Sequence, residues 1–289
     1  MMKEYEKFLE KLELDKSPNT IRSYKSAIDE FLAHFNIKDI EDIKKLTPEQ
    51  YDEYQIYLKS KGLKSSSVNT FTRPVKVFLN WLKTRKHITE NPFAGLEYLS
   101  KEKKIPFFLS DEEAIAMMNS CKNLQDKLII SFFLYEGLRR DELCNTKVSD
   151  LIIDDDEIHI ITKGKGDKER PLLINPEIRN DLENYLKTRR FPDNEYLFVS
   201  PFNKKFSSSA MWYKVKSVGK RAGIKEDRLS KLTPHKLRHT FCSEMSEVSD
   251  NDNAIQEAMG HANIETTKIY THLKNNAVDR AMRKMKYGK

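Results

Sequence analysis

The segment "TPHKLRHTF" (Thr233–Phe241) combines a helix start with histidine and arginine side chains at helical spacing. Thr233 is a typical N-cap residue, and the proline that follows it fits the first helical turn. His235 and Arg238 are three residues apart, so an α-helix places both side chains on one face. The segment therefore predicts a helix that presents an imidazole and a guanidinium together.

A metal site is the main alternative for this segment, because His235, His239 and Cys242 could be imagined as ligands. Zinc proteases of the His-Glu-x-x-His type carry a glutamate between their two histidines, and a structural zinc site needs a complete set of Cys or His ligands. The sequence offers neither. We therefore expect no metal, and because no GxxxxGK[ST] loop is present we expect no nucleotide cofactor.

Two basic motifs precede this helix in the chain. "EGLRRDEL" (Glu136–Leu143) places Arg139 just beyond a glycine that ends a predicted helix. "TKGKGDKER" (Thr162–Arg170) places Lys165 between two glycines at the tip of a predicted hairpin. Taken singly, the first motif is well explained as a surface arginine at a helix end and the second as a flexible basic turn.

A tyrosine near the end of the chain has unusually polar neighbours. In "GHANIETTKIYTH" (Gly260–His272), Tyr270 follows His261 by nine residues in a run of small polar residues. A tyrosine hydroxyl has a pKa near 10 and needs cationic neighbours to act as a nucleophile near neutral pH. Two arginines, a lysine and two histidines could supply that environment and could also stabilise the charge that develops at phosphorus. The combination indicates cleavage of a phosphodiester.

Positive charge is concentrated in separate parts of the chain, which has a net charge of +7 and a pI near 9.0. Residues 54–89 contain eight Lys or Arg and no acidic residue, and residues 201–240 contain eleven against two. Such blocks are often only solvated faces, but several of them together favour a nucleic-acid partner. From the first block we expect DNA contacts by Lys64, Arg73, Lys76, Lys83 and Arg85.

Apolar residues recur at helical spacing through the first hundred residues. The pattern predicts a helix that buries Tyr5 and Phe8, and further helices that begin at "SPNT" (Ser17–Thr20), at Thr47-Pro48 and after "SSS" (Ser65–Ser67). Pro74 lies inside the last of these and is expected to kink it. Residues 1–98 are therefore predicted to form a helical domain.

A charged segment without periodicity, "LSKEKKIP" (Leu99–Pro106), is predicted to be a linker to a second domain of residues 107–289. That domain begins with a helix that Ser110 caps. Two strands follow at Asp156–Thr162 and Glu169–Ile174, and the remainder is helical. The predicted fold is mainly α, with two domains and a small antiparallel sheet in the second.

The composition also indicates where the protein works. The three cysteines (Cys121, Cys144 and Cys242) are widely spaced and odd in number, which favours free thiols in a reducing compartment. No apolar run is long enough for a membrane span, and the first residues lack the apolar stretch of a signal peptide. We expect a cytoplasmic protein without a membrane partner.

The chain resembles the tyrosine recombinases of the phage-integrase superfamily, and most of all their Xer branch. The resemblance rests on four motifs in the family's order: "GLRRDEL", "GKGDKER", "HKLRHTF" and "GHANIETTKIYTH". The N-terminal half is similar to the family's SAM-like core-binding domain, including "NTIRSY" and the closing "NP". One departure is "SEVSDNDNAIQ" (Ser246–Gln256), which is more polar than usual and has Ser249 where a turn glycine is common.

The resemblance implies a role for each motif residue. Tyr270 would be the nucleophile and Lys165 the general acid, while Glu142 would orient Arg139. The phosphate-activating set would be Arg139, His235, Arg238 and His261. The implied partners are double-stranded DNA and further copies of the chain, as a tetramer on paired DNA sites and a monomer or dimer when free.

The predicted function is that of a site-specific recombinase, which cleaves and rejoins DNA strands through a 3′-phosphotyrosine intermediate. A type IB topoisomerase-like enzyme, which relaxes DNA with similar residues, is the alternative within the same chemistry. A DNA-binding regulator that has lost catalysis is the alternative of another class, against which the complete set of six motif residues argues.

Overall fold

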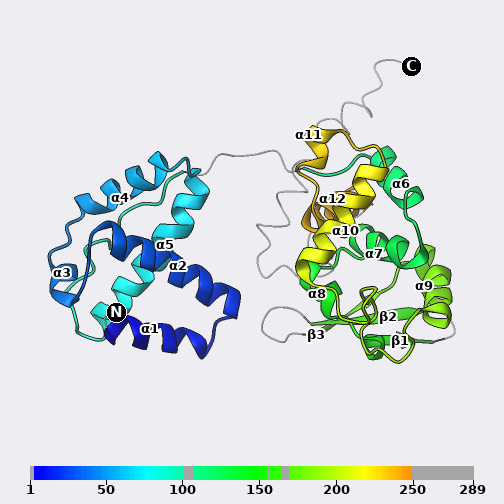
Figure 1. Ribbon diagram of the computed structural model, residues 1–289, viewed down its shortest axis with the longest axis horizontal. Helices are drawn as coiled ribbons and strands as arrows, with labels where there is room; N and C mark the ends of the chain where they lie inside the picture. The colour runs from blue at the N-terminus through cyan, green and yellow to red at the C-terminus, as the bar shows by residue number, and fades with distance from the viewer. Residues whose placement is uncertain (1–2, 101–106, 155–156, 164–168, 249–289) are drawn as a thin grey trace, which may run out of the picture. The chain divides into compact units, whose positions relative to one another are not determined.

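The computed structural model describes residues 3–100, 107–154, 157–163 and 169–248. The chain divides into two compact units, Met1–Lys104 and Ile105–Lys289, and each is described by itself (Figure 1). Most described residues are helical, and the small sheet belongs to the second unit. The mainly helical fold with a small antiparallel sheet is therefore confirmed.

The first unit is a bundle in which long amphipathic helices enclose an aromatic core. Four of its helices were predicted from the sequence, and Ser17 caps the second of them by accepting a hydrogen bond from the backbone nitrogen of Thr20 at 3.3 Å. A short helix that begins after Asp39 was not predicted. The elements are α1 (Lys3–Glu13), α2 (Pro18–His34), α3 (Ile40–Lys44), α4 (Glu49–Ser60) and α5 (Ser65–Thr84).

Helix α5 organises this core, because α1, α2 and α4 all pack against it. The ring of Phe78 on α5 lies 5.1 Å from that of Phe8 and 5.6 Å from that of Tyr5, both on α1. Pro74 is buried within α5, which continues through it to Thr84. Burial of its ring in the core offsets part of the cost of the lost backbone hydrogen bond.

Two asparagine side chains fasten the end of the first unit to α5. Asn91 donates to the backbone oxygen of Lys76 at 3.3 Å and accepts from the backbone nitrogen of Phe93 at 2.9 Å. Asn69 binds both the backbone oxygen and the backbone nitrogen of Leu99, at 2.7 and 2.9 Å. Leu99, the first residue of the predicted linker, is thus held by the bundle, whereas residues 101–106 lie outside the described residues.

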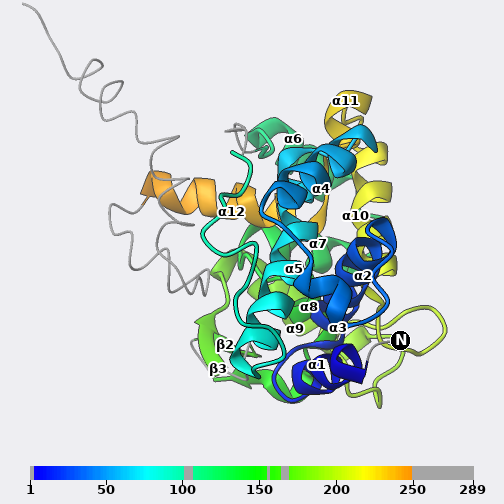
Figure 2. The ribbon, with the colours of Figure 1, turned by 90° about the vertical axis from the view of Figure 1, so that its left-hand side faces the viewer.

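The second unit surrounds the buried helix α7 with further helices and one small sheet (Figures 1 and 2). Ser110 caps α6 in a reciprocal capping box with Glu113, as predicted. The helices are α6 (Asp111–Asn119), α7 (Leu124–Leu134), α8 (Arg140–Asn145), η1 (Val148–Asp150), α9 (Pro176–Thr188), α10 (Ser208–Arg221), α11 (Glu226–Leu229) and α12 (Pro234–Val248). Helix α12 packs against α7, and Figure 2 shows its C-terminal end extending beyond the other helices of this unit.

The sheet has three antiparallel strands in the order β1-β2-β3. Strands β2 (Ile158–Lys163) and β3 (Glu169–Leu173) form the predicted pair, in which Lys163 lies opposite Glu169. Strand β1 (Leu151–Ile153) was not predicted. Figure 1 shows the strands at one end of the unit with α9 beside them. Within the described residues no helix has the length and apolarity needed to cross a membrane.

Candidate active site

A tight turn at Gly137 joins the buried helix α7 to α8. Gly137 has a φ of 57°, a conformation that favours glycine. A Cβ atom at this position would also overlap the ring of Phe241 on α12. The turn ends at Arg139, the N-cap residue of α8. The predicted glycine stop is confirmed, and its close packing against α12 brings two of the sequence motifs together.

Glu142 lies between the two arginines of the site. Its carboxylate accepts from the backbone nitrogen of Arg139 at 2.7 Å and from Nη1 of the same residue at 2.6 Å. Nη1 of Arg238 lies 4.0 Å from Oε2 of Glu142, the oxygen that accepts from the backbone nitrogen of Arg139. The same Nη1 also donates to the backbone oxygen of Gly137. The side chain of Glu142 is 6% exposed, against 2% for Arg238 and 37% for Arg139. One buried carboxylate thus supports a buried cation and a partly exposed one.

Helix α12 begins as the sequence predicts and presents His235 at the surface. The hydroxyl of Thr233 accepts a hydrogen bond from the backbone nitrogen of Lys236 at 3.3 Å. Partial burial, followed by the charges of Arg238, Lys236 and Arg139, lowers the pKa of His235 below its ordinary value. A lowered pKa keeps this imidazole neutral at physiological pH, when it can both accept and donate a hydrogen bond.

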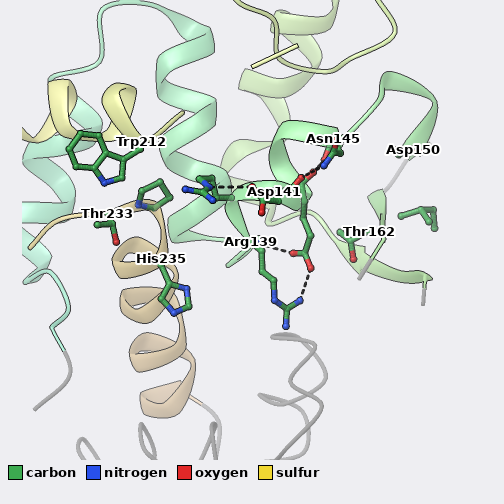
Figure 3. A pocket seen from close by; sticks show the side chains of 13 residues that line it. Arg139, Asp141, Asn145, Asp150, Thr162, Trp212, Thr233 and His235 are labelled. Atoms are coloured by element: carbon green, nitrogen blue, oxygen red, sulfur yellow. Dashed lines mark hydrogen bonds and ion pairs between the residues drawn. The ribbon is translucent and has the colours of Figure 1, made fainter. Parts of the chain in front are cut away.

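These side chains border a cavity of about 900 Å³ (Figure 3). Figure 3 shows Arg139 and His235 at one end of the cavity, and Asp141 and Asn145 toward the other. The wall combines α8, the end of η1, strand β2, α10 and the start of α12. The lining residues are Arg139, Arg140, Asp141, Glu142, Asn145, Thr146, Asp150, Ile161, Thr162, Trp212, Thr233, Pro234 and His235.

The described residues account for four of the seven predicted active-site residues. Arg139, Glu142, His235 and Arg238 come together, although Arg238 is buried and is not among the residues that line the cavity. Lys165, His261 and Tyr270 lie outside the described residues, as does Ser249.

The predicted DNA contacts on α5 fall into two groups. The side chains of Lys64, Arg73, Lys83 and Arg85 are exposed. Lys76 differs, because its ammonium donates to the backbone oxygen of Leu96 and lies 4.5 and 4.7 Å from the ring centroids of Tyr51 and Tyr98. Burial lowers the pKa of Lys76. An ammonium that is bound inside its own domain is less available to DNA, so the predicted contact of Lys76 has less support from its surroundings than the other four.

The metal alternative has little support among the described residues. The rings of His235 and His239 are packed edge to face with centroids 4.4 Å apart. The thiol of Cys242 is buried, and burial raises its pKa to about 12, which disfavours the thiolate that a metal would need. In the described part of the chain no group of three His, Cys, Asp or Glu side chains could hold a metal ion.

Sequence reasoning missed two features of this region. Glu136 is 4% exposed, accepts a hydrogen bond from the backbone nitrogen of Asn175 at 2.8 Å, and has a pKa that burial raises to about 7. Trp212 lines the cavity, with the ammonium of Lys216 5.1 Å from its ring centroid. Glu136 stands at the end of an apolar run, which was a signal of its burial, whereas nothing local marked Trp212.

Comparison with known proteins covers both units. Residues 108–277 match the phage integrase family, and residues 5–86 match the phage integrase N-terminal SAM-like domain. The chain is 32% identical over 287 residues to a tyrosine recombinase XerA of Pyrococcus horikoshii. This alignment covers 97% of this chain and 93% of the relative. It is 30% identical over 269 residues to a tyrosine recombinase XerC of Haemophilus influenzae. That alignment covers 91% of this chain and 89% of the relative.

Solved structures agree on the fold. A crystal structure of XerA recombinase aligns with a TM-score of 0.54 at 30% identity, over 94% of both chains. The XerH site-specific recombinase, bound to its palindromic difH substrate after cleavage, aligns with a TM-score of 0.76 at 21% identity, over 91% of this chain and 79% of that one. These matches favour recombination over topoisomerase-like relaxation. The chain therefore belongs to the phage integrase family and, within it, to the Xer-like tyrosine recombinases.

Proposed function

We propose that this recombinase cleaves and rejoins double-stranded DNA at the cavity between α8 and α12, where Arg139 binds the scissile phosphate and the buried Arg238 adds positive charge behind it. The observation that carries the proposal is the buried carboxylate of Glu142, which orients Arg139 through two hydrogen bonds and lies within 4.0 Å of Arg238. Two guanidinium groups held in this way can stabilise the additional negative charge of a five-coordinate phosphorus.

His235 would act as a neutral hydrogen-bonding group at the same phosphate. Its lowered pKa means that Arg139 and Arg238 supply the positive charge, while the imidazole can donate to a phosphate oxygen or relay a proton. A neutral imidazole also avoids adding a third cation that the two arginines would repel.

The covalent step is assigned to residues outside the described part of the chain. The hydroxyl of Tyr270 gives up its proton to water as its oxygen forms a bond to phosphorus, and the bond from phosphorus to the 5′-oxygen breaks. Lys165 gives a proton to the departing 5′-oxygen, and His261 donates a hydrogen bond to the phosphate. The product is a 3′-phosphotyrosine, which a 5′-hydroxyl of another strand can attack without ATP because the phosphodiester energy is retained.

DNA binding by related proteins supports the choice of substrate. XerH is described with its difH substrate, and a fragment of lambda integrase is described as a dimer on a core site. For the present chain we propose duplex DNA as the partner and a tetramer on paired sites as the exchanging assembly, because each of four strands needs its own nucleophile.

Recovery of the covalent intermediate tests this function. DNA that remains attached to the denatured protein in its host is sequenced, and a duplex with that sequence, nicked near the cleavage position, is incubated with purified protein. The nick lets the short cleaved strand diffuse away, so that the adduct accumulates. We expect an adduct with the wild type and none with Tyr270→Phe, at similar DNA affinity. Normal adduct yield from Tyr270→Phe would remove this residue from its role, and no adduct from the wild type would favour a regulator without catalysis.

A further inference from the structure

The second arginine of the "GLRRDEL" motif is not used by the proposed chemistry. Arg140 is adjacent to Arg139, yet it is bound to different partners. Its Nε donates to Oδ1 of Asp141 at 3.2 Å, whereas Arg139 is bound to Glu142. Both arginines line the same cavity. Arg139 and Arg140 thus both present a guanidinium group to the cavity, and each group is bound by a different carboxylate.

A small network orients Arg140 from the side of α10. The hydroxyl of Ser208, the first residue of α10, donates to the same Oδ1 of Asp141 at 2.5 Å. This hydrogen bond, followed by that from Arg140, lowers the pKa of Asp141, so the carboxylate is ionised at physiological pH. The hydrogen bond to Asp141 uses Nε of Arg140. Within the described residues, both terminal nitrogens of this guanidinium are therefore available to a ligand.

A second cation, Lys205, is bound to a residue of the cavity wall. Nζ of Lys205 donates to Oδ1 of Asn145 at 2.8 Å, and Asn145 in turn donates to the backbone oxygen of Asp141 at 2.6 Å. Both Arg140 and Lys205 lie close enough to Asp141 to lower its pKa. Local helix energetics do not explain Arg140, because a cation in the first turn is disfavoured by the helix dipole.

We infer that Arg140 binds a phosphate next to the scissile one on the cleaved strand, as a positioning contact that aligns the backbone with Arg139. The inference rests on the proposed function. Because both guanidinium groups border the same cavity and are bound to different carboxylates, Arg140 can reach a phosphate next to the one that Arg139 binds. The forked guanidinium suits phosphate oxygens better than the ammonium of Lys205 does.

Arg140 therefore acts in binding and alignment, and it does not touch the reacting atoms. On the nicked duplex, Arg140→Gln should raise the DNA concentration for half-maximal adduct formation about tenfold, the cost of about one charge-assisted hydrogen bond. The rate at saturating DNA should change less than about twofold, because uniform binding affects affinity and not the chemical step. Arg140→Lys should recover part of the affinity.

A series of duplexes, each with one uncharged methylphosphonate near the cleavage position, identifies the contacted phosphate. We expect one substitution next to the scissile phosphate to weaken the wild type about tenfold and to leave Arg140→Gln unaffected, because the contact is already lost. Arg190→Gln, which removes an exposed arginine outside the cavity, should behave as the wild type at every position. If Arg140→Gln and the wild type respond equally to every methylphosphonate, the inference is wrong. Adduct formation by the wild type on unmodified DNA separates that result from a failure of the proposed function.

Discussion

Glu142 holds Arg139 at two points, accepting a hydrogen bond from its backbone nitrogen at 2.7 Å and another from its Nη1 at 2.6 Å. The same carboxylate lies 4.0 Å from Nη1 of Arg238, which is almost completely buried. A single anion therefore sets the start of α8, the direction of one arginine and the charge balance of another. This arrangement links the stability of the second unit to the geometry of its active site.

Replacement of Glu142 by Gln should damage both properties. The amide keeps the size of the side chain but removes the charge opposite the buried Arg238, so we expect a loss of about 3 kcal/mol in the free energy of unfolding. Adduct formation at saturating DNA should fall about a hundredfold, because Arg139 loses its alignment. Denaturant unfolding and single-turnover adduct assays measure the two effects. A variant with normal rate and normal stability would show that Glu142 is dispensable.

The turn at Gly137 predicts a suppressible defect. Gly137→Ala places a methyl group against the ring of Phe241 and puts a non-glycine residue at a φ of 57°, so we expect a destabilisation above about 2 kcal/mol. Phe241→Leu in the same chain should recover the part that comes from the collision. Thermal unfolding of the single and double variants gives the coupling between the two sites. Strictly additive effects would mean that the ring and the methyl group do not compete.

Glu136 should make stability depend on pH. Burial raises its pKa from 4.5 to about 7, so the folded state holds a proton that the unfolded state releases above pH 4.5. The favourable contribution is complete below pH 4.5 and is lost as pH rises to about 7. Glu136→Gln, which is neutral and can still accept from Asn175, should therefore exceed the wild type in stability at pH 8, by up to about 3 kcal/mol, and not at pH 4. Denaturant unfolding across this range tests the sign, and a difference that is constant with pH would contradict it.

Two basic residues on α5 should give opposite phenotypes. Arg73 is exposed, so Arg73→Gln should reduce the slope of log K against log salt by about 0.9 and leave stability within about 0.5 kcal/mol. Lys76 is bound to Leu96 and two tyrosine rings, so Lys76→Gln should lower the free energy of unfolding by about 1 kcal/mol without a change in the salt slope. Salt titrations of DNA binding and denaturant unfolding compare the pair. A reduced slope for Lys76→Gln would instead support the predicted DNA contact of this residue.

Lys165 is expected to protonate the departing 5′-oxygen. Lys165→Ala should therefore cleave ordinary DNA about 10²–10⁴-fold more slowly, the typical cost of a lost general acid. A sulfur at the bridging 5′ position is a better leaving group that needs little protonation, so the same variant should cleave such a substrate at nearly the wild-type rate. Arg139→Ala should remain slow on both substrates, because it stabilises charge. Without rescue by sulfur, Lys165 would be a DNA-positioning residue and His235 the next acid to test.

The sequence by itself determined those elements whose signals are local. Ser110 was recognised as a cap and "SPNT" as a helix start, because a cap is a hydrogen bond between a side chain and a backbone group three residues away. The helix of "TPHKLRHTF" and the glycine turn before Arg139 follow the same logic. The four motifs, in their order, were sufficient to indicate the family before any geometry was known.

Tertiary structure alone decided what depends on residues far apart in the chain. Strand β1 has three residues and exists through its pairing with β2, which no local pattern encodes. The charge of Lys76 is visible in the sequence, but its contacts with Leu96, Tyr51 and Tyr98 appear only when the chain folds. The approach of Glu142 to Arg238 likewise needed α8 and α12 to meet at Gly137. Chemical identity is carried by the residues, but their contacts arise when packing brings separate segments together.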